Sequence, residues 1–332
     1  MEFKRLGKSG LSVPAVIFGA WAIGGWLWGK SDDKEAVKAI QKSIELGCTC
    51  IDTAPIYGFG HSEEVVGKAV KGKRDKVLIA TKCGLRWDCG DGEFFFDTKD
   101  NSGKDVKVYR NLKKDSLFKE CDASLKRLGT DVIDLYQCHW SDSTTPLDET
   151  MEALLSLKEQ GKIRAIGVSN FTPDMIETCL ESGDIASDQP KYSLLFRDIE
   201  NDILPFCQKH DVGLIVYGPI GQGLLTGKVT LDRKFAEDDF RTGQPWFQPK
   251  NLKRILDTLE KIEPIAKEHG KTLAQLAINW VISEPGITSA IVGARTPEQV
   301  IENIGAVDFK LGEDERRLMR ECFEELGEAE EE

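Results

Sequence analysis

The stretch VLIATK, residues 77–82, decides the fold, because it is a nearly uninterrupted apolar run that ends on a lysine. The stretch GLIVY, residues 213–217, is a second run of this kind. Strands with one face in water alternate apolar and polar residues, whereas continuous runs are typical of parallel strands buried on both faces. The two stretches therefore predict a parallel sheet that is covered by helices.

The same pattern recurs outward from these stretches, each time followed by an amphipathic segment with helical periodicity. Eight short β-branched runs predict strands, at Ala15–Phe18, Thr49–Asp52, Val77–Thr81, Ile133–Cys138, Ile163–Val168, Ile185–Gln189, Gly213–Val216 and Ile287–Val292. The amphipathic segments predict helices at Asp33–Leu46, Ser62–Lys71, Leu112–Leu128, Leu147–Gln160, Pro173–Glu181, Asp202–His210, Asn251–His269 and Pro297–Ile304. Alternation of eight strands with eight helices is the count of a (β/α)8 barrel, so we expect an α/β protein with a TIM barrel.

Segments outside this repeat complete the expected barrel. Residues 3–14, FKRLGKSGLSVP, are predicted to form a hairpin around Lys8–Gly10 that plugs one end. The connections Gly84–Asn111 and Gly218–Lys250 are oversized, and each follows a strand and precedes a helix. Such connections lie at the C-terminal face, where barrel enzymes keep their active sites. An additional helix is expected at Lys271–Ser283.

Composition limits the function classes. The chain has 332 residues, 44 Lys and Arg against 56 Asp and Glu, and a net charge of −12. This acidic balance argues against nucleic acid or an anionic membrane as the main partner. Without a repeat, a linker or a step in composition, we expect one domain over residues 1–326 and a frayed acidic tail at 327–332.

Cysteine usage and the uncharged stretch near the N-terminus bear on location. The nine cysteines are odd in number and scattered, without a CxxC pair or a Cys/His cluster, so we expect buried free thiols, no metal site and a cytoplasmic protein. Residues 9–29 carry no charge, but Pro14 and five glycines interrupt them. A buried strand with a glycine-rich loop therefore fits them better than a signal peptide or a membrane span.

Polar side chains end successive predicted strands. They are Asp52, Lys82, His139, Ser169 with Asn170, Gln189 and Tyr217, and Tyr57 follows Asp52 in the next loop. Singly, Asp52 has an alternative reading as a helix cap, His139 as a satisfied core histidine and Lys82 as a side chain that reaches solvent. A charge that ends a buried strand is unusual unless it is paired, so we expect Asp52 and Lys82 to be partners. Because these polar residues end successive strands, a shared functional site explains them better than a separate structural role for each residue.

This set suits proton transfer to a carbonyl group. The phenol of Tyr57 has an ordinary pKa of about 10, and a nearby ammonium such as Lys82 is expected to lower it. Asp52 would keep Lys82 charged, and neutral His139 would hydrogen-bond a carbonyl oxygen. The set offers no nucleophile, which suits reduction of a carbonyl by hydride from a cofactor. Of the other histidines, His210 and His269 are expected to be helix-terminal cations, and His61 is left open.

A set of motifs carries a resemblance to a known family. The segments IDTAPIYGFGHSEEVVGKAV, IATKCG, IDLYQCHW, GKIRAIGVSNF, YGPIGQGLLTGK and IVGARTPEQVIENIGA occur in order along the chain. Their sequence and spacing resemble those of aldo-keto reductases, in the branch of bacterial general-stress and sugar-type aldehyde reductases, from Phe3 to about Phe323. The resemblance implies a TIM barrel that binds NADP(H) without a Rossmann domain. It also implies Asp52, Tyr57, Lys82 and His139 as catalytic residues, with Tyr57 as general acid.

The resemblance further implies a cofactor site. Ser169, Asn170 and Gln189 match positions that bind the nicotinamide carboxamide, Tyr217 matches the ring that stacks beneath it, and Gly218–Lys228 matches the pyrophosphate loop. The alternative role of Ser169 and Asn170, capping the next helix, is better filled by Thr172. The complete cofactor set is Trp21, Asp52, Ser169, Asn170, Gln189, Tyr217, Gly218, Pro219, Ile220, Gly221, Gly223, Leu224, Lys228, Arg241, Gly293, Arg295, Gln299 and Asn303.

Cofactor preference depends on the segment after the last predicted strand. In the branch most often described a Lys-Ser pair precedes the phosphate-binding turn, but here Gly293 and Ala294 stand there, and Gln299 replaces an arginine. Arg295 remains and can pair with the 2′-phosphate of NADP. We therefore expect NADP(H) with a moderate preference, and NAD(H) as a second cofactor.

The expected function is reduction of small aldehydes, aldoses or ketones. Trp28, Trp87 and Trp140 are the expected substrate contacts, although barrel packing explains part of the tryptophan content equally well. One alternative is a polyol or inositol dehydrogenase working in the oxidative direction. Another is a cofactor-sensing regulatory subunit, since channel-associated β-subunits share this barrel and its four residues. A small carbonyl compound is the expected partner, and no obligatory protein partner is expected.

Overall fold

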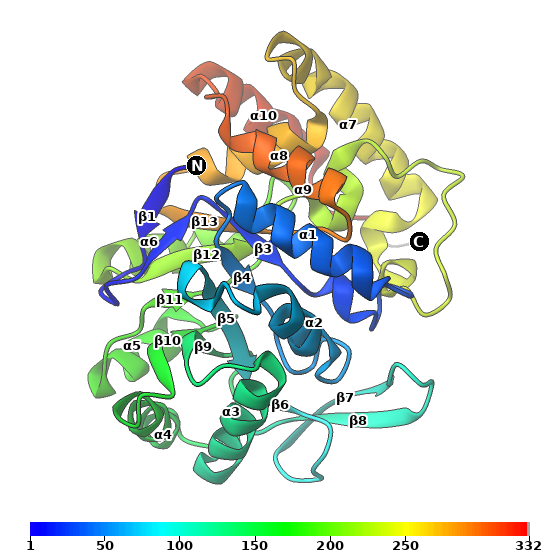
Figure 1. Ribbon diagram of the computed structural model, residues 1–332. Coiled ribbons are helices and arrows are strands. Elements are labelled where there is room, and N and C mark those ends of the chain that lie inside the picture. Colours follow the sequence, from blue (N-terminus) through cyan, green and yellow to red (C-terminus); the bar gives the residue numbers. More distant parts are fainter. Residues whose placement is uncertain (331–332) are drawn as a thin grey trace.

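The computed structural model describes residues 1–330, and its centre is a closed barrel of parallel strands (Figure 1). Around the barrel the strand order is β10-β11-β12-β13-β3-β4-β5-β9. The strands are β3 (Val16–Gly19), β4 (Cys50–Asp52), β5 (Leu78–Cys83), β9 (Ile133–Cys138), β10 (Ile163–Val168), β11 (Ser187–Asp188), β12 (Gly213–Tyr217) and β13 (Ile287–Gly293). The expected (β/α)8 barrel is confirmed. Its seam is the pairing of β13 with β3, in which Ala290 is the register partner of Val16.

Helices surround the barrel at the expected places. They are α1 (Asp33–Glu45), α2 (His61–Val70), α3 (Lys114–Leu128), α4 (Leu147–Glu159), α5 (Pro173–Ser182), α6 (Ile203–His210), α7 (Pro249–Glu268), α8 (Leu273–Ser283) and α9 (Pro297–Ile304). Their starts are chemically marked, because the side chains of Asp32, Thr172, Thr272 and Thr296 accept hydrogen bonds from the first turns of α1, α5, α8 and α9. Short 3-10 turns are η1 (Ala22–Gly24), η2 (Arg74–Lys76), η3 (Asp198–Glu200), η4 (Gly221–Thr226), η5 (Phe240–Gly243), η6 (Pro245–Phe247) and η7 (Gly305–Val307).

A tenth helix, α10 (Glu313–Leu326), was not expected from the sequence. Its buried residues Met319, Cys322, Phe323 and Leu326 follow the helical spacing, while charged residues dominate the rest of the helix. The chain beyond α10 is held against α7, because Asn251 exchanges two hydrogen bonds with the backbone of Glu330. The expectation of a frayed tail is therefore wrong for residues up to Glu330, and residues 331–332 lie outside the described chain.

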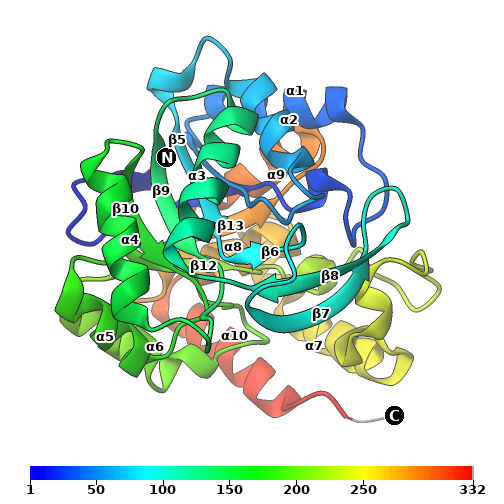
Figure 2. The ribbon, with the colours of Figure 1, turned by 90° about the horizontal axis from the view of Figure 1, so that it is seen from below.

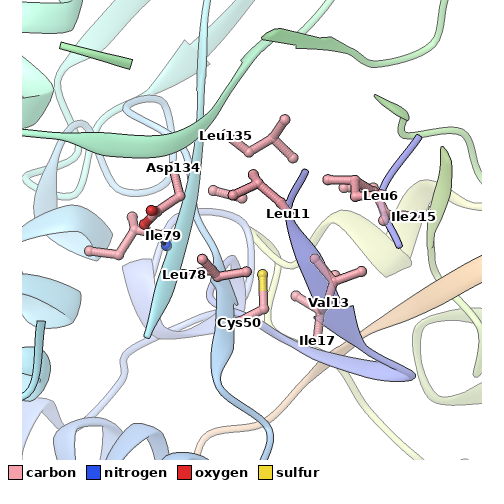
Figure 3. Close-up of a pocket in the computed structure, with 11 residues that line it drawn as sticks. Leu6, Leu11, Val13, Ile17, Cys50, Leu78, Ile79, Asp134, Leu135 and Ile215 are labelled. Atoms are coloured by element: carbon pink, nitrogen blue, oxygen red, sulfur yellow. Dashed lines mark hydrogen bonds between the residues drawn. The ribbon is translucent and has the colours of Figure 1, made fainter. Parts of the chain in front are cut away.

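The N-terminal hairpin closes one end of the barrel, as expected. Strands β1 (Phe3–Arg5) and β2 (Ser12–Pro14) pair antiparallel, and Leu6, Leu11 and Val13 are buried. Figure 3 shows these side chains facing residues of the barrel strands, among them Ile17 and Cys50. The small cavity left between them measures about 10 Å³ and is lined mainly by aliphatic groups, so it is expected to stay dry.

The opposite face carries the two long connections. The first holds a small antiparallel sheet in the order β6-β8-β7, built from β6 (Leu85–Arg86), β7 (Glu93–Lys99) and β8 (Asp105–Arg110). The hairpin β7–β8 lies across this face (Figure 2), where the indole N–H of Trp26 donates to Thr98 of β7 at 3.0 Å. The second connection holds η4, η5 and η6. The sequence predicted the length of both connections but not the sheet.

The state of the cysteines and the character of the helices can be compared with the expected free thiols and the expected lack of a membrane span. All nine cysteines are free, and eight are buried, as expected; Cys89 is the half-buried exception. Among residues 1–330, no helix has both the length and the apolar character needed to cross a membrane.

Candidate active site

Four side chains meet where β4, β5 and β9 end. Lys82 is fully buried, and its Nζ donates to Oδ1 of Asp52 at 2.6 Å, to the backbone oxygen of Thr53 at 3.0 Å and to the hydroxyl of Tyr57 at 3.2 Å. His139 follows β9, and its ring lies edge-on to that of Tyr57 with 5.8 Å between centroids. The expected pairing of Asp52 with Lys82 is confirmed, and the structure brings all four residues together.

Tyr57 is placed by close backbone packing. A Cβ atom on Gly24 would lie 2.7 Å from the carbonyl carbon and oxygen of Tyr57, so only glycine allows the β3–α1 loop to approach this closely. Asn101 fixes the contact, because its Nδ2 donates to the backbone oxygens of Gly24 at 3.0 Å and Gly58 at 3.4 Å. Three separate segments therefore hold the phenol in place.

Burial decides the protonation of these groups. Burial raises the pKa of Tyr57 and the charge of Asp52 adds to this, so that Lys82 only partly offsets the rise. The expected net lowering of the Tyr57 pKa is therefore wrong. Burial acts to lower the pKa of Lys82, but Asp52 and Tyr57 together raise it above its ordinary value. Burial, and then the Lys82 charge, hold the pKa of His139 well below its usual range. Near neutral pH the site thus holds a phenol, an ammonium and a neutral imidazole.

The second oxygen of Asp52 binds two amides. Nε2 of Gln189 lies 2.8 Å from Oδ2, and Nε2 of Gln137 lies 3.2 Å from it. Nε2 of Gln189 also donates to Oε1 of Gln137 at 3.2 Å. Gln137 was missed in the sequence. The available signal was its position on β9, two residues before His139, which directly follows that strand, since residues i and i+2 of a strand face the same side.

The expected carboxamide-binding residues form one connected network. Ser169 donates to the backbone oxygen of Gln189 at 2.7 Å, and Asn170 Nδ2 donates to Ser169 Oγ at 3.0 Å and to the backbone oxygen of His139 at 3.2 Å. Tyr217 donates to Asn170 Oδ1 at 3.0 Å. Thr172, not Ser169 or Asn170, caps α5. Asn170 has a φ of 60°, a left-handed conformation that is uncommon for a residue other than glycine.

The expected pyrophosphate loop has the backbone such a role requires. Gly218, Gly221 and Gly223 all have positive φ. Leu224 is buried in the core, Pro219 is buried and Ile220 is partly buried. Lys228 is bound elsewhere, because its Nζ pairs with Glu302 at 2.6 Å on the surface. Within the loop, the backbone N–H groups of Gly221 and Gly223 donate to the backbone oxygens of Gly218 and Ile220, so these donors and the lysine are already partnered.

Two guanidinium groups lie near the start of α9. Arg295 donates to the backbone oxygen of Trp28, and burial and the charge of Arg241 lower its pKa. Arg241 itself forms a two-pronged pair with Asp239, at 2.8 and 2.6 Å. Gln299 Oε1 accepts from the backbone N–H of Arg295 at 2.7 Å.

Asn303 sits behind this segment, where its Nδ2 donates to the backbone oxygen of Gly293 at 3.1 Å. Gln299 and Asn303 thus hold the turn that carries Arg295. The amide oxygen of Gln299 and the amide nitrogen of Asn303 are already hydrogen-bonded there. This arrangement limits what the two side chains offer to an adenine ring.

Aromatic rings cover the phenol. Trp21 stacks on Tyr57 at 5.8 Å, Trp28 stands edge-on to Trp21 at 5.3 Å, and Phe240 lies against Trp21 at 5.2 Å and Trp28 at 5.1 Å. Phe240 was missed because nothing in the sequence of its long loop links it to the β3–α1 loop. Its backbone N–H binds the oxygen of Leu27 at 3.1 Å.

The other expected substrate contacts lie in the same apolar cluster, further toward the small sheet. Trp140 packs on Phe95 at 5.6 Å, and Trp87 packs on Phe59 at 5.4 Å. Of the three predicted tryptophans, Trp28 contacts Trp21 directly, whereas Trp87 and Trp140 are linked to Trp21 through other rings and Trp26.

Residues 15–324 match the Aldo/keto reductase family. The chain belongs to this family. Among curated relatives it is 39% identical to Aldo-keto reductase YhdN of Bacillus subtilis, over 90% of this chain and 87% of that protein. It is 38% identical to the NADH-specific methylglyoxal reductase of Escherichia coli, over 97% and 98%. Among solved structures, the glycerol dehydrogenase AKR11B4 from Gluconobacter oxydans superposes with a TM-score of 0.88 at 37% identity, covering 99% of this chain and 97% of that one.

Proposed function

We propose that this aldo/keto reductase uses NADP(H) in preference to NAD(H) and reduces small aldehydes, aldoses or ketones to alcohols. The observation that carries the proposal is the position of Lys82 Nζ between Asp52 and the Tyr57 hydroxyl, with neutral His139 beside the phenol. A buried, protonated phenol with an adjacent ammonium is a proton donor whose conjugate base is stabilised.

Each residue then has one task in the reduction. A bound nicotinamide cofactor would supply the hydride to the carbonyl carbon. The Tyr57 hydroxyl donates its proton to the carbonyl oxygen, and Lys82 stabilises the phenolate that remains. Asp52 keeps Lys82 charged and oriented through its short ion pair. His139 donates a hydrogen bond to the carbonyl oxygen, which stabilises the negative charge that develops there.

The donor set fits a dinucleotide. Ser169, Asn170, Gln189 and Tyr217 would hold the nicotinamide end. The glycines between Gly218 and Gly223 carry no side chain, so the loop backbone can come close to phosphates. Arg241 and Arg295 share one acid, Asp239, so the cluster carries a net positive charge that suits a 2′-phosphate. The Escherichia coli relative is named as NADH-specific, so cofactor choice needs its own measurement.

The substrate is proposed to be short and polar. The ring contacts among Trp21, Trp28, Phe240 and Tyr57 are close, which favours a small molecule at the phenol. The names of two similar proteins point to three-carbon compounds, methylglyoxal and glycerol. The second name also favours an alternative, oxidation of a polyol by the same residues in reverse. The buried free thiols suit a reducing cytoplasm as the place of action.

A steady-state screen tests the proposal. Short aldehydes, aldoses, ketones and polyols are assayed in both directions with NADPH, NADP+, NADH and NAD+. We expect the highest kcat/KM for a small aldehyde with NADPH. Higher kcat/KM for a polyol would favour the dehydrogenase, and turnover of none of these compounds by a chain that binds the cofactor would contradict both.

A further inference from the structure

Gln137 is hydrogen-bonded to both Asp52 and Gln189 but has no part in the mechanism above. It is fully buried on β9, and in the strand register it lies between Lys82 on β5 and Gly167 on β10. A Cβ atom at position 167 would lie 2.9 Å from Cγ of Gln137, so the absence of a side chain there makes room for the glutamine. The strand register therefore places an amide beside the ion pair of Asp52.

The chemistry of Asp52 fixes the direction of every hydrogen bond nearby. An ionised carboxylate only accepts, so both Gln137 and Gln189 must turn their NH₂ groups toward Oδ2. Gln189 then uses its second N–H to bind Oε1 of Gln137. Both N–H groups of Gln189 are occupied, and its side chain has only Oε1 left to offer a ligand.

We propose that Gln137 is a positioning residue that orients Asp52 toward Lys82 and holds Gln189 with only its carbonyl oxygen available. This inference rests on the proposed function, because it assigns Gln189 Oε1 to the N–H of a nicotinamide carboxamide. Gln137 acts at both ends: its amide donates to the carboxylate that serves proton transfer, and its oxygen accepts from the residue that serves cofactor binding.

The binding of two dinucleotides by the full chain tests the effect of Gln137 on cofactor binding through Gln189. NADP+ carries a carboxamide, whereas its 3-acetylpyridine analogue has an acetyl group without an N–H. Titration calorimetry of the wild type is expected to show tighter binding of NADP+. Gln137→Met frees one N–H of Gln189 for the acetyl oxygen, so the ratio of the two Kd values should fall about three- to tenfold, the effect of one hydrogen bond. The same pair is run with NAD+ and its analogue.

Gln137→Glu separates the two roles of this side chain, the hydrogen bond that it donates to Asp52 and the one that it accepts from Gln189. A carboxylate still accepts from Gln189, so the Kd ratio should stay near that of the wild type. It cannot donate to Asp52 unless it is protonated, so kcat should acquire a titration that the wild type lacks. The titratable groups that share this region, and whose own profiles must be compared, are Asp52, Tyr57, Lys82, His139, Asp188 and Tyr217.

Asn279→Leu is the matched control, since it removes a buried amide that binds backbone oxygens of Ala306 and Phe309. It should leave both the Kd ratio and the pH profile unchanged. An unchanged Kd ratio in a folded Gln137→Met variant, or no new titration in Gln137→Glu, would overturn the role of Gln137 alone. If the wild type binds neither dinucleotide pair, the proposed function fails, and this role fails with it.

Discussion

The ammonium nitrogen of Lys82 lies 3.2 Å from the hydroxyl oxygen of Tyr57, inside a site where burial opposes ionisation of the phenol. The lysine therefore does not make the phenol acidic in the resting protein. Its larger effect comes during proton transfer, because it stabilises a phenolate that burial would otherwise make costly. This distinction leads to measurable expectations for the two residues.

Tyr57→Phe removes the transferable proton and leaves the ring stack with Trp21 in place. We expect kcat to fall about 10²- to 10⁴-fold, the usual contribution of a general acid, with little change in cofactor affinity. Steady-state kinetics and fluorescence titration with NADPH measure the two quantities. Tyr109→Phe, on β8, is the control and should behave as wild type. A Tyr57→Phe variant within a few-fold of wild type would remove this residue from the acid role.

The pH dependence should differ between the two directions of reaction. Burial holds the pKa of Tyr57 above its ordinary value, so the phenol stays protonated and reduction should be level from about pH 7 to pH 9. Oxidation needs the phenolate, whose fraction rises about tenfold per pH unit below that pKa. Profiles of kcat/KM in both directions check this. Oxidation that stays flat over the same range would contradict the assignment.

The ion pair of Lys82 with Asp52 should be coupled in stability. Lys82→Met leaves a buried carboxylate without its cation, which should lower the free energy of unfolding by about 3–5 kcal/mol. Asp52→Asn in the same chain should restore most of this stability but not the activity. Urea unfolding of both single variants and the double variant gives the coupling energy. Additive losses would mean that the two charges do not interact.

Arg295→Ala tests cofactor preference. The loss of one charge-assisted contact to a 2′-phosphate should weaken NADPH by about tenfold or more, whereas NADH lacks that phosphate and should change little. Because Arg295 also binds the backbone oxygen of Trp28, any shared loss for both cofactors reports that structural contact. Arg5→Ala, which breaks an exposed pair with Asp211, is the control. Equal losses for NADPH and NADH would show that Arg295 does not read the phosphate.

Glu120 should make stability depend on pH. Burial raises its pKa to about 8, so the folded protein keeps a proton that the unfolded chain releases above its ordinary pKa of about 4.5. The free energy of unfolding should therefore fall as pH rises between these values and level off above about pH 8. The glutamine of the Glu120→Gln variant cannot ionise. Between pH 6 and pH 8, the free energy of unfolding of this variant should therefore fall by up to about 2 kcal/mol less than that of the wild type. Exposed Glu260→Gln is the control, and parallel wild-type and Glu120→Gln curves would contradict this account.

The sequence predicted those parts of the fold that rest on local periodicity. Buried strands and amphipathic helices each have a hydrophobic pattern that can be recognised within a short stretch of sequence. The polar residues at the strand ends predicted that Asp52, Tyr57, Lys82 and His139 lie together. Contacts between distant loops have no such local pattern. Phe240 covers Trp21 only because the long connection after β12 folds against the β3–α1 loop. The direction of the Tyr57 pKa shift was wrongly predicted for a similar reason, since the burial that raises this pKa depends on the whole site.

Closure of the barrel has a consequence for how the chain folds during synthesis. Strand β3 pairs with β4 on one side and with β13 on the other. Because β13 is the last barrel strand in the sequence, the second edge of β3 stays unpaired until β13 has left the ribosome. Until then the edge of β3 is open, and exposed strand edges in partly made chains invite misassociation. The N-terminal hairpin, which inserts Leu6 and Leu11 into the unfinished barrel, is available from the start to cover apolar surface during that wait.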